Sequence, residues 1–241
     1  MFKIVFINLG FIVSLSFTIF VPALFAAIPV LGVAVRLMGF LWCCAYLSAA
    51  ALSLKSLSDY GNFGFADFFG NLKTCWPAGL FFGGIVLVGY VLFTMVIPFY
   101  LGMNSLLGLL LAAALFWAML VTVLALQFFF VIRARLEAHF LKAVKKCFII
   151  FFDNPLFCAF TFAHNAVMLI FSGIVAFLFP GPAGILLFLD QGMRLRLMKY
   201  DWLEANPGAD RSKVPWEELL VEEQEKTGRR SLRSFIFPWK D

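Results

Sequence analysis

The side chains most able to do chemistry in an apolar setting lie in the C-terminal third of this sequence. Asp190 stands four residues before Arg194, and side chains at that spacing share one face of a helix and can pair. Ionisable groups within membrane spans are rare and often functional, so the two could relay a proton or a cation. Because Asp190 falls late in its apolar segment, the sequence favours a structural ion pair, with Arg194 extended towards the headgroups.

His164 and Asn165 stand next to each other inside another apolar segment. A histidine there could exchange protons near neutral pH. The alternative is hydrogen bonding between helices, which contributes only about 0.6–2 kcal/mol in membranes and which the sequence favours. We take Asp190, Arg194, His164 and Asn165 together as the candidate intramembrane polar site.

Motifs of catalysis and metal binding are missing from the sequence. It has no nucleophile elbow, no P-loop, no zinc-protease motif and no dinucleotide fingerprint. Its five cysteines lie in or beside apolar runs, where cysteine acts as a small apolar residue. We therefore expect no catalytic residue, no cofactor and no metal, and a protein that is not an enzyme; an intramembrane enzyme is the least favoured class.

The composition shows which environment these residues occupy. Of the 241 residues 63% are hydrophobic and 14% are charged, whereas soluble domains are about 45–50% apolar and about 25% charged. The apolar runs are long and continuous, without the alternation of a barrel strand. The sequence predicts an all-α, polytopic helical membrane protein, because helices satisfy their own backbone hydrogen bonds in lipid.

Six apolar segments approach or exceed the roughly 20 residues needed to span a bilayer. They cover residues 4–28, 31–54, 76–98, 105–132, 156–179 and 183–198. The last is short and contains Asp190. These spans make a transmembrane domain over residues 1–199, followed by a charged cytoplasmic tail over 200–241 with a helix at about 215–227.

Basic residues in the short connections predict the orientation. The 133–146 connection holds five of them, while the turns near residues 100 and 180 hold none. Since Lys and Arg accumulate in cytoplasmic loops, six spans place both termini in the cytoplasm.

Two connections have the pattern of amphipathic elbow helices on the cytoplasmic membrane surface. In 134–150, apolar residues recur at helical spacing, and the other face carries Arg135, Lys142, Lys145 and Lys146. Such a helix is suited to anionic headgroups. The shorter 64–73 segment has the same pattern more weakly. Both end in F-F-x-N-x-x-x-C, at Phe68–Cys75 and at Phe151–Cys158, which indicates either a parallel duplication or, as we favour, chance in a chain rich in Phe.

The end of the tail mixes cations with aromatic residues. The residues expected to contact the inner leaflet are Arg229, Arg230, Arg233, Phe235, Phe237 and Trp239. A disordered, solvated tail is an equal alternative, because its charges are nearly balanced. The same balance argues against nucleic acid as a partner.

The layout resembles the YesL-like family of small bacterial membrane proteins over residues 5–200. The resemblance rests on Phe20–Ala23, Ile28–Ala34, Asp67–Lys73 and the basic segment Arg135–Phe148 leading into Asn154-Pro155-Leu156. Members have five or six spans and no established biochemical activity, and they are often associated with carbohydrate uptake systems. The charged tail departs from their usual short C-terminus.

The resemblance implies a multi-pass protein of the bacterial inner membrane. With the missing catalytic motifs, it leads us to expect a non-enzymatic accessory or scaffold protein. Its expected partners are the lipid bilayer and a membrane transport complex, such as one for carbohydrates, or a second copy of the chain. The alternative is a small transporter or channel that uses Asp190, Arg194 and His164.

Overall fold

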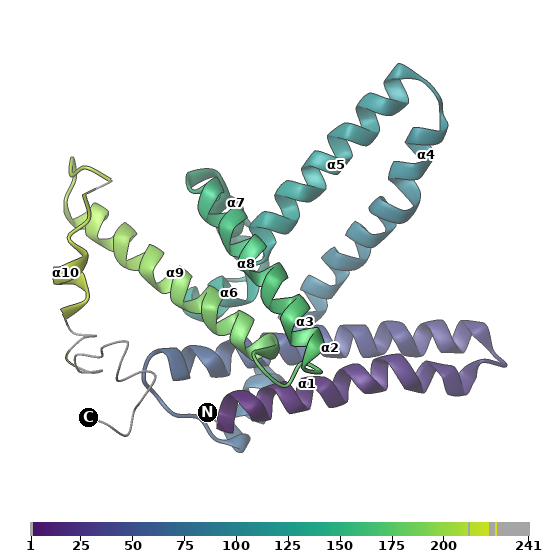
Figure 1. Cartoon of the computed structure of the whole chain (residues 1–241), viewed down its shortest axis with the longest axis horizontal. Coiled ribbons are helices and arrows are strands. Elements are labelled where there is room, and N and C mark those ends of the chain that lie inside the picture. The colour runs from purple at the N-terminus through teal and green to yellow at the C-terminus, as the bar shows by residue number, and fades with distance from the viewer. Residues whose placement is uncertain (1, 212, 222–224, 226–241) are drawn as a thin grey trace. The chain divides into compact units, whose positions relative to one another are not determined.

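The computed structural model describes residues 2–211, 213–221 and 225, and these residues form helices and connecting turns without a strand. The chain divides into two units, Met1–Met193 and Arg194–Asp241. The first unit holds all the long apolar helices. Figure 1 shows the order of the elements along the chain.

The first two helices form an antiparallel hairpin (Figure 1). Helix α1 covers Phe2–Phe20 and continues as a short 3-10 helix, η1, over Val21–Phe25; helix α2 covers Pro29–Ser58. Pro29 occupies the first turn of α2, where its missing N–H leaves no hydrogen bond unmade. Across the hairpin, the Tyr46 hydroxyl donates to the Ile7 carbonyl at 2.8 Å and the Trp42 indole donates to Ser14 Oγ at 3.1 Å.

The third predicted span begins earlier than the sequence indicated. Helix α3 covers Phe65–Val91 and runs through a π-helical turn, η2, at Leu92–Val96 into α4 at Ile97–Gly102. The expected separate elbow at 64–73 is therefore the first part of α3. Asp67 accepts a hydrogen bond from the Gly64 backbone at 2.7 Å and starts the helix. The helix then passes through Pro77, as membrane helices tolerate.

Helices α2 and α3 approach closely at small residues. A Cβ at Gly79 would overlap the backbone of Ala45, and one at Gly83 would lie 2.7 Å from Leu41. The neighbouring Gly84 has no atom within 4 Å of that position. This one-sided use of glycine is typical of helices that pack through small residues in a membrane.

The fourth predicted span and the basic elbow form three helices. Helix α5 covers Leu106–Leu126, α6 covers Phe129–Leu136 and α7 covers Phe140–Asp153. The elbow predicted at 134–150 is thus interrupted, because α6 ends at Leu136 and the next residue, Glu137, adopts a left-handed conformation (φ 46°). Ala143, Cys147 and Ile150 form the buried face of α7.

Helix α8 covers Pro155–Ile174 and α9 covers Gly181–Ala205, with an irregular turn between them. Asn8 of α1 is fully buried and holds this turn. Its Nδ2 donates to the carbonyls of Leu178 and Pro180 at 3.0 and 2.9 Å, and its Oδ1 accepts from the Ala183 N–H at 2.9 Å. One amide from the first helix therefore satisfies three backbone groups of the turn.

Within the described residues, five helices are long and apolar enough to cross a membrane: Phe2–Phe25, Pro29–Ser58, Phe65–Gly102, Leu106–Leu126 and Pro155–Ile174. They are compatible with an integral membrane protein. Helix α9, which contains the sixth predicted span, is not among them. The tail helix predicted at 215–227 is described over α10, Trp216–Leu219.

Candidate functional site

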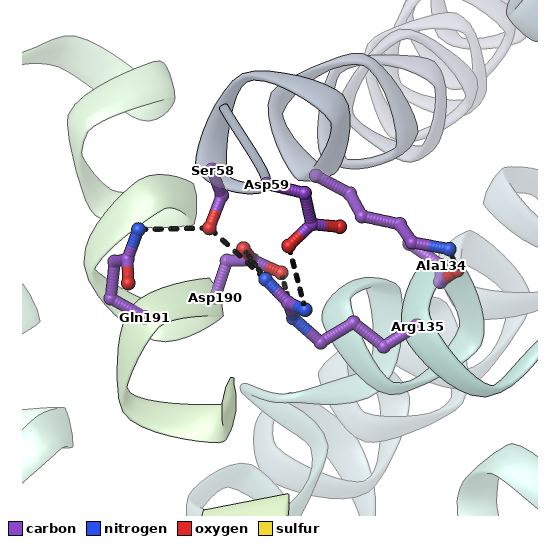
Figure 2. Close-up of polar contacts among 7 residues, drawn as sticks. Ser58, Asp59, Ala134, Arg135, Asp190 and Gln191 are labelled. Carbon is purple, nitrogen blue, oxygen red and sulfur yellow. Dashed lines mark hydrogen bonds and ion pairs between the residues drawn. The ribbon is translucent and has the colours of Figure 1, made fainter. Parts of the chain in front are cut away.

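Arg135 is the centre of the main charged site in the first unit (Figure 2). Its guanidinium donates two hydrogen bonds to the Asp190 carboxylate. The distance from Arg135 Nε to Asp190 Oδ1 is 2.7 Å, and Arg135 Nη2 donates to Asp190 Oδ2. The same group reaches Asp59 at 3.3 Å and Ser58 Oγ at 3.0 Å. Gln191 donates to Ser58 at 2.8 Å. We call Ser58, Asp59, Arg135, Asp190 and Gln191 the arginine cluster.

The arginine cluster joins three elements that are far apart in the sequence. Ser58 and Asp59 end α2, Arg135 stands near the end of the short helix α6, and Asp190 and Gln191 lie in α9. A second bond, from Lys55 Nζ to the Ala134 carbonyl at 3.1 Å, fixes α6 to α2 at the same place. Side-chain contacts with α2 and α9 therefore hold the end of this short helix in place.

The burial of the two carboxylates indicates which of them contributes more to the stability of the cluster. The Arg135 and Asp190 side chains are 9% and 3% exposed, whereas Asp59 is 41% exposed. A buried charge without its partner is destabilising by about 3–5 kcal/mol, while an exposed pair contributes about 0–1 kcal/mol. The bidentate Arg135–Asp190 pair is the main connection and Asp59 is an addition to it.

The structure gives Asp190 a partner that the sequence analysis did not propose. We expected Arg194, four residues along the same helix, but Arg135 comes from 55 residues away. Arg194 belongs to the second unit. We also expected Arg135 to face the headgroups together with Lys142, Lys145 and Lys146. Its side chain is nearly buried in the arginine cluster and has little surface left to contact headgroups. Lys142 and Lys145 are exposed and Lys146 is half-buried.

His164 and Asn165 lie in α8, in a second polar region without Asp, Glu, Lys or Arg. Asn165 Nδ2 donates to Gln127 Oε1 at 3.4 Å, and Gln127 Nε2 donates to the carbonyls of Leu124 and Cys158 at 2.8 and 2.9 Å. We call Gln127 and Asn165 the amide pair. The His164 ring stacks on Phe188 with centroids 3.8 Å apart.

The second polar region is incompletely satisfied. Asn165 Oδ1 and His164 Nδ1 are buried and have no hydrogen-bond partner among the residues that the structure describes. Buried polar atoms in proteins are nearly always paired, so each exception requires an explanation. The candidate site of the sequence analysis therefore divides into a satisfied charged cluster with Asp190 and an incompletely satisfied region with His164 and Asn165.

Two further features limit the chemistry available to the described residues. They contain no group of three or more His, Cys, Asp or Glu side chains able to hold a metal ion. Cys147 is fully buried in α7, and burial raises the pKa of its thiol to about 12. A thiol that remains protonated at neutral pH is a poor nucleophile.

Sequence reasoning missed Ser58, Asp59, Gln191 and Asn8. Asn8 had a readable signal, since an amide inside an apolar span needs a partner. Ser58 and Asp59 stand at the end of α2, where polar residues are ordinary, and Gln191 lies inside α9 next to Asp190. The predicted leaflet contacts Arg229, Arg230, Arg233, Phe235, Phe237 and Trp239 lie outside the described residues.

Comparison with known proteins adds no relative. Neither a family model, nor a curated protein, nor a solved structure gives a significant match to this chain.

Proposed function

We propose that this chain is a non-enzymatic accessory or scaffold protein of the bacterial inner membrane that supports a membrane transport complex. The observation that carries the proposal is the arginine cluster, in which the buried charges of Arg135 and Asp190 neutralise each other and bind three segments together. Charges held in this way stabilise an arrangement of helices rather than carry ions. The resemblance to the YesL-like family makes carbohydrate uptake systems the first partners to test.

The contacts of the first unit also support a topology. The start of α1 lies near the turn after α2, since Phe6 contacts Phe65 with ring centroids 4.3 Å apart and Lys3 Nζ lies 5.0 Å from the Phe63 ring centroid. Asp59, in the same turn, contacts Arg135 after α5. If α1, α2, α3–α4 and α5 each cross once, all three places fall on one side. The basic connection makes that side the cytoplasm.

Helix α9 returns to that side within a short distance. From Gly181 to Asp190 it rises about 14 Å, at about 1.5 Å per residue, which is half of a hydrocarbon core of about 30 Å. The turn before Gly181 is bonded to Asn8, inside the first span. Although α8 is itself long and apolar enough to cross, the short rise of α9 leads us to infer that α8 and α9 form a re-entrant hairpin, which would leave the C-terminus cytoplasmic without a sixth crossing. Irregular backbone at membrane depth is tolerated where protein satisfies it, as Asn8 does here.

Labelling with a membrane-impermeant maleimide on intact cells tests this topology. Ala176→Cys, in the turn between α8 and α9, should remain unlabelled until the membrane is opened. Its control, Asn104→Cys in the turn between α4 and α5, should label at once. The native cysteines are all buried and give a low background. Equal labelling of the two variants would place the 176 turn outside and restore six crossings.

The scaffold function is tested by what accompanies the protein from native membranes. Tagged protein, extracted in mild detergent, should retain components of one solute uptake system, and deleting the gene should reduce uptake of that solute. Reconstituted alone, the protein should move no solute. Transport by the purified protein that Asp190→Asn abolishes would support the transporter class and contradict the proposal.

A further inference from the structure

A cavity of about 550 Å³ lies in the first unit beside the amide pair. Its wall is formed by α1, α2, α3, α8, α9 and the residues around α5 and α6. Most of the lining is apolar and aromatic, including Phe11, Phe82, Phe130, Phe162 and Phe177. A volume between about 300 and 1,000 Å³ is usual for sites that bind small molecules.

Gln127 and Asn165 are the polar side chains among the described residues that line this cavity, and no charged residue lines it. Gln127 uses both amide hydrogens on the carbonyls of Leu124 and Cys158, and its oxygen accepts from Asn165. Asn165 Oδ1 has no partner. The amide pair therefore lacks one hydrogen-bond donor, and a ligand could supply it.

One wall of the cavity is held in a strained backbone conformation. Ala176 and Phe177 both adopt left-handed conformations, with φ of 51° and 60°. Such strain in non-glycine residues persists where the surroundings enforce it, and it is frequent at ligand sites. Backbone hydrogen bonds close this turn on the end of α8: the Phe177 N–H donates to the Ser172 carbonyl at 2.6 Å and the Ala176 N–H donates to the Gly173 carbonyl at 3.3 Å. The residues that follow are held as well, since Asn8 bonds to the Leu178 and Pro180 carbonyls and Ser172 Oγ accepts from the Gly181 N–H at 3.0 Å. The ring of Phe177 lies 6.3 Å from that of Phe11, centroid to centroid.

We propose that this cavity binds a neutral single-chain lipid whose terminal hydroxyl donates a hydrogen bond to Asn165 Oδ1. The apolar wall accommodates the chain, and its location among apolar helices gives entry from the bilayer. A charged headgroup is excluded, because no counter-charge lines the cavity and an unpaired buried ion is strongly unfavourable. Because Asn165 Nδ2 bonds to Gln127 Oε1 at 3.4 Å, Asn165 Oδ1 remains to accept the hydrogen bond from the ligand.

Photolabelling of the full-length protein tests the proposal with a diazirine derivative of hexadecanol. Unmodified hexadecanol should compete for labelling. Its methyl ether, which has the same chain and an oxygen but no donor, should compete about tenfold less well, the factor expected from one net hydrogen bond. Hexadecanoate at pH 8 should not compete. Equal competition by alcohol and ether would overturn the role of Asn165.

Two variants of α8 provide a matched pair. Ala166 lines the cavity and Ala163 does not, being exposed on the same helix. Ala166→Phe should fill the cavity and abolish specific labelling, while Ala163→Phe should label as the native protein does. Labelling of Ala166→Phe at the native level would place the lipid elsewhere and overturn the proposal.

Asn165→Leu examines the hydrogen bond itself and does not depend on filling the cavity. This variant should still take up the chain but lose the preference for alcohol over ether. A preference retained in Asn165→Leu would contradict the assignment. Because none of these readouts involves a transport partner, they can fail while the scaffold function stands, and the reverse also holds.

Discussion

The arginine cluster and the amide pair are both polar regions among apolar helices, but only the first is complete. Arg135 bonds to Asp190, Asp59 and Ser58, and Ser58 also accepts from Gln191. In the second region, Asn165 Oδ1 and His164 Nδ1 are buried without a partner. The difference separates a site that holds the fold from a site that is ready to accept a ligand, since buried polar groups without partners are costly.

The largest effect should come from removing Arg135. Arg135→Ala leaves the Asp190 carboxylate buried and unpaired, so unfolding should become easier by about 3–5 kcal/mol. Thermal melting of the detergent-solubilised protein measures it. The control is Lys145→Ala on α7, an exposed residue whose loss should change little. A melting temperature equal to that of the control would mean that the cluster does not hold α6.

Asn8 is a third buried polar group, and its hydrogen bonds are complete, as those of the arginine cluster are. Asn8→Leu leaves the Leu178 carbonyl and the Ala183 N–H without partners and removes one of the two hydrogen bonds to the Pro180 carbonyl, which should cost about 2–3 kcal/mol. We also expect faster protease cleavage near residue 178. Unchanged cleavage in Asn8→Leu would show that the turn does not depend on α1.

A smaller contrast lies within the amide pair. Gln127→Leu removes hydrogen bonds to two carbonyls and should destabilise the protein by about 1–2 kcal/mol. Asn165→Leu removes an unsatisfied oxygen together with one long hydrogen bond to Gln127, so in lipid-free detergent the two changes should offset each other and the net effect should be close to zero. The same melting assay applies. If Asn165→Leu destabilises as much as Gln127→Leu, then Asn165 Oδ1 is satisfied by a group from outside the chain even in detergent.

The smallest effect is expected at Asp59. Its side chain is 41% exposed and its contact with Arg135 is monodentate at 3.3 Å. Asp59→Asn should therefore change stability by less than about 1 kcal/mol. Asp190→Asn, made at the buried end of the same guanidinium, should have a clearly larger effect. Equal effects of the two variants would show that burial does not set the contribution of each carboxylate to stability.

Much of the fold could be predicted from the sequence, and the candidate site only in part. Apolar runs bounded by Pro29, Gly102 and Pro155 gave most of the helices, because local composition determines whether a segment can enter lipid. The partner of Asp190 could not be read in the same way. Arg194 is close in sequence, whereas the contact with Arg135 depends on how α6 and α9 pack.

The elbow helices show the same limit. Nothing in the sequence of 64–73 separates a surface helix from the first turns of α3, since both need the same apolar spacing. The interruption of 134–150 at Glu137 was equally hidden, because the left-handed conformation there is not one that Glu favours.

A charge-removal cycle decides whether the charges of Arg135 and Asp190 serve structure alone. Arg135→Met and Asp190→Leu should each destabilise the protein strongly, and the double variant should recover most of that loss, because an apolar pair replaces the ion pair without leaving a buried charge. We expect the double variant to melt close to the native protein and to retain the same co-purifying partner. If the double variant folds as the native protein does but loses that partner or its supporting activity, the charges themselves are needed for function and their role is not structural alone.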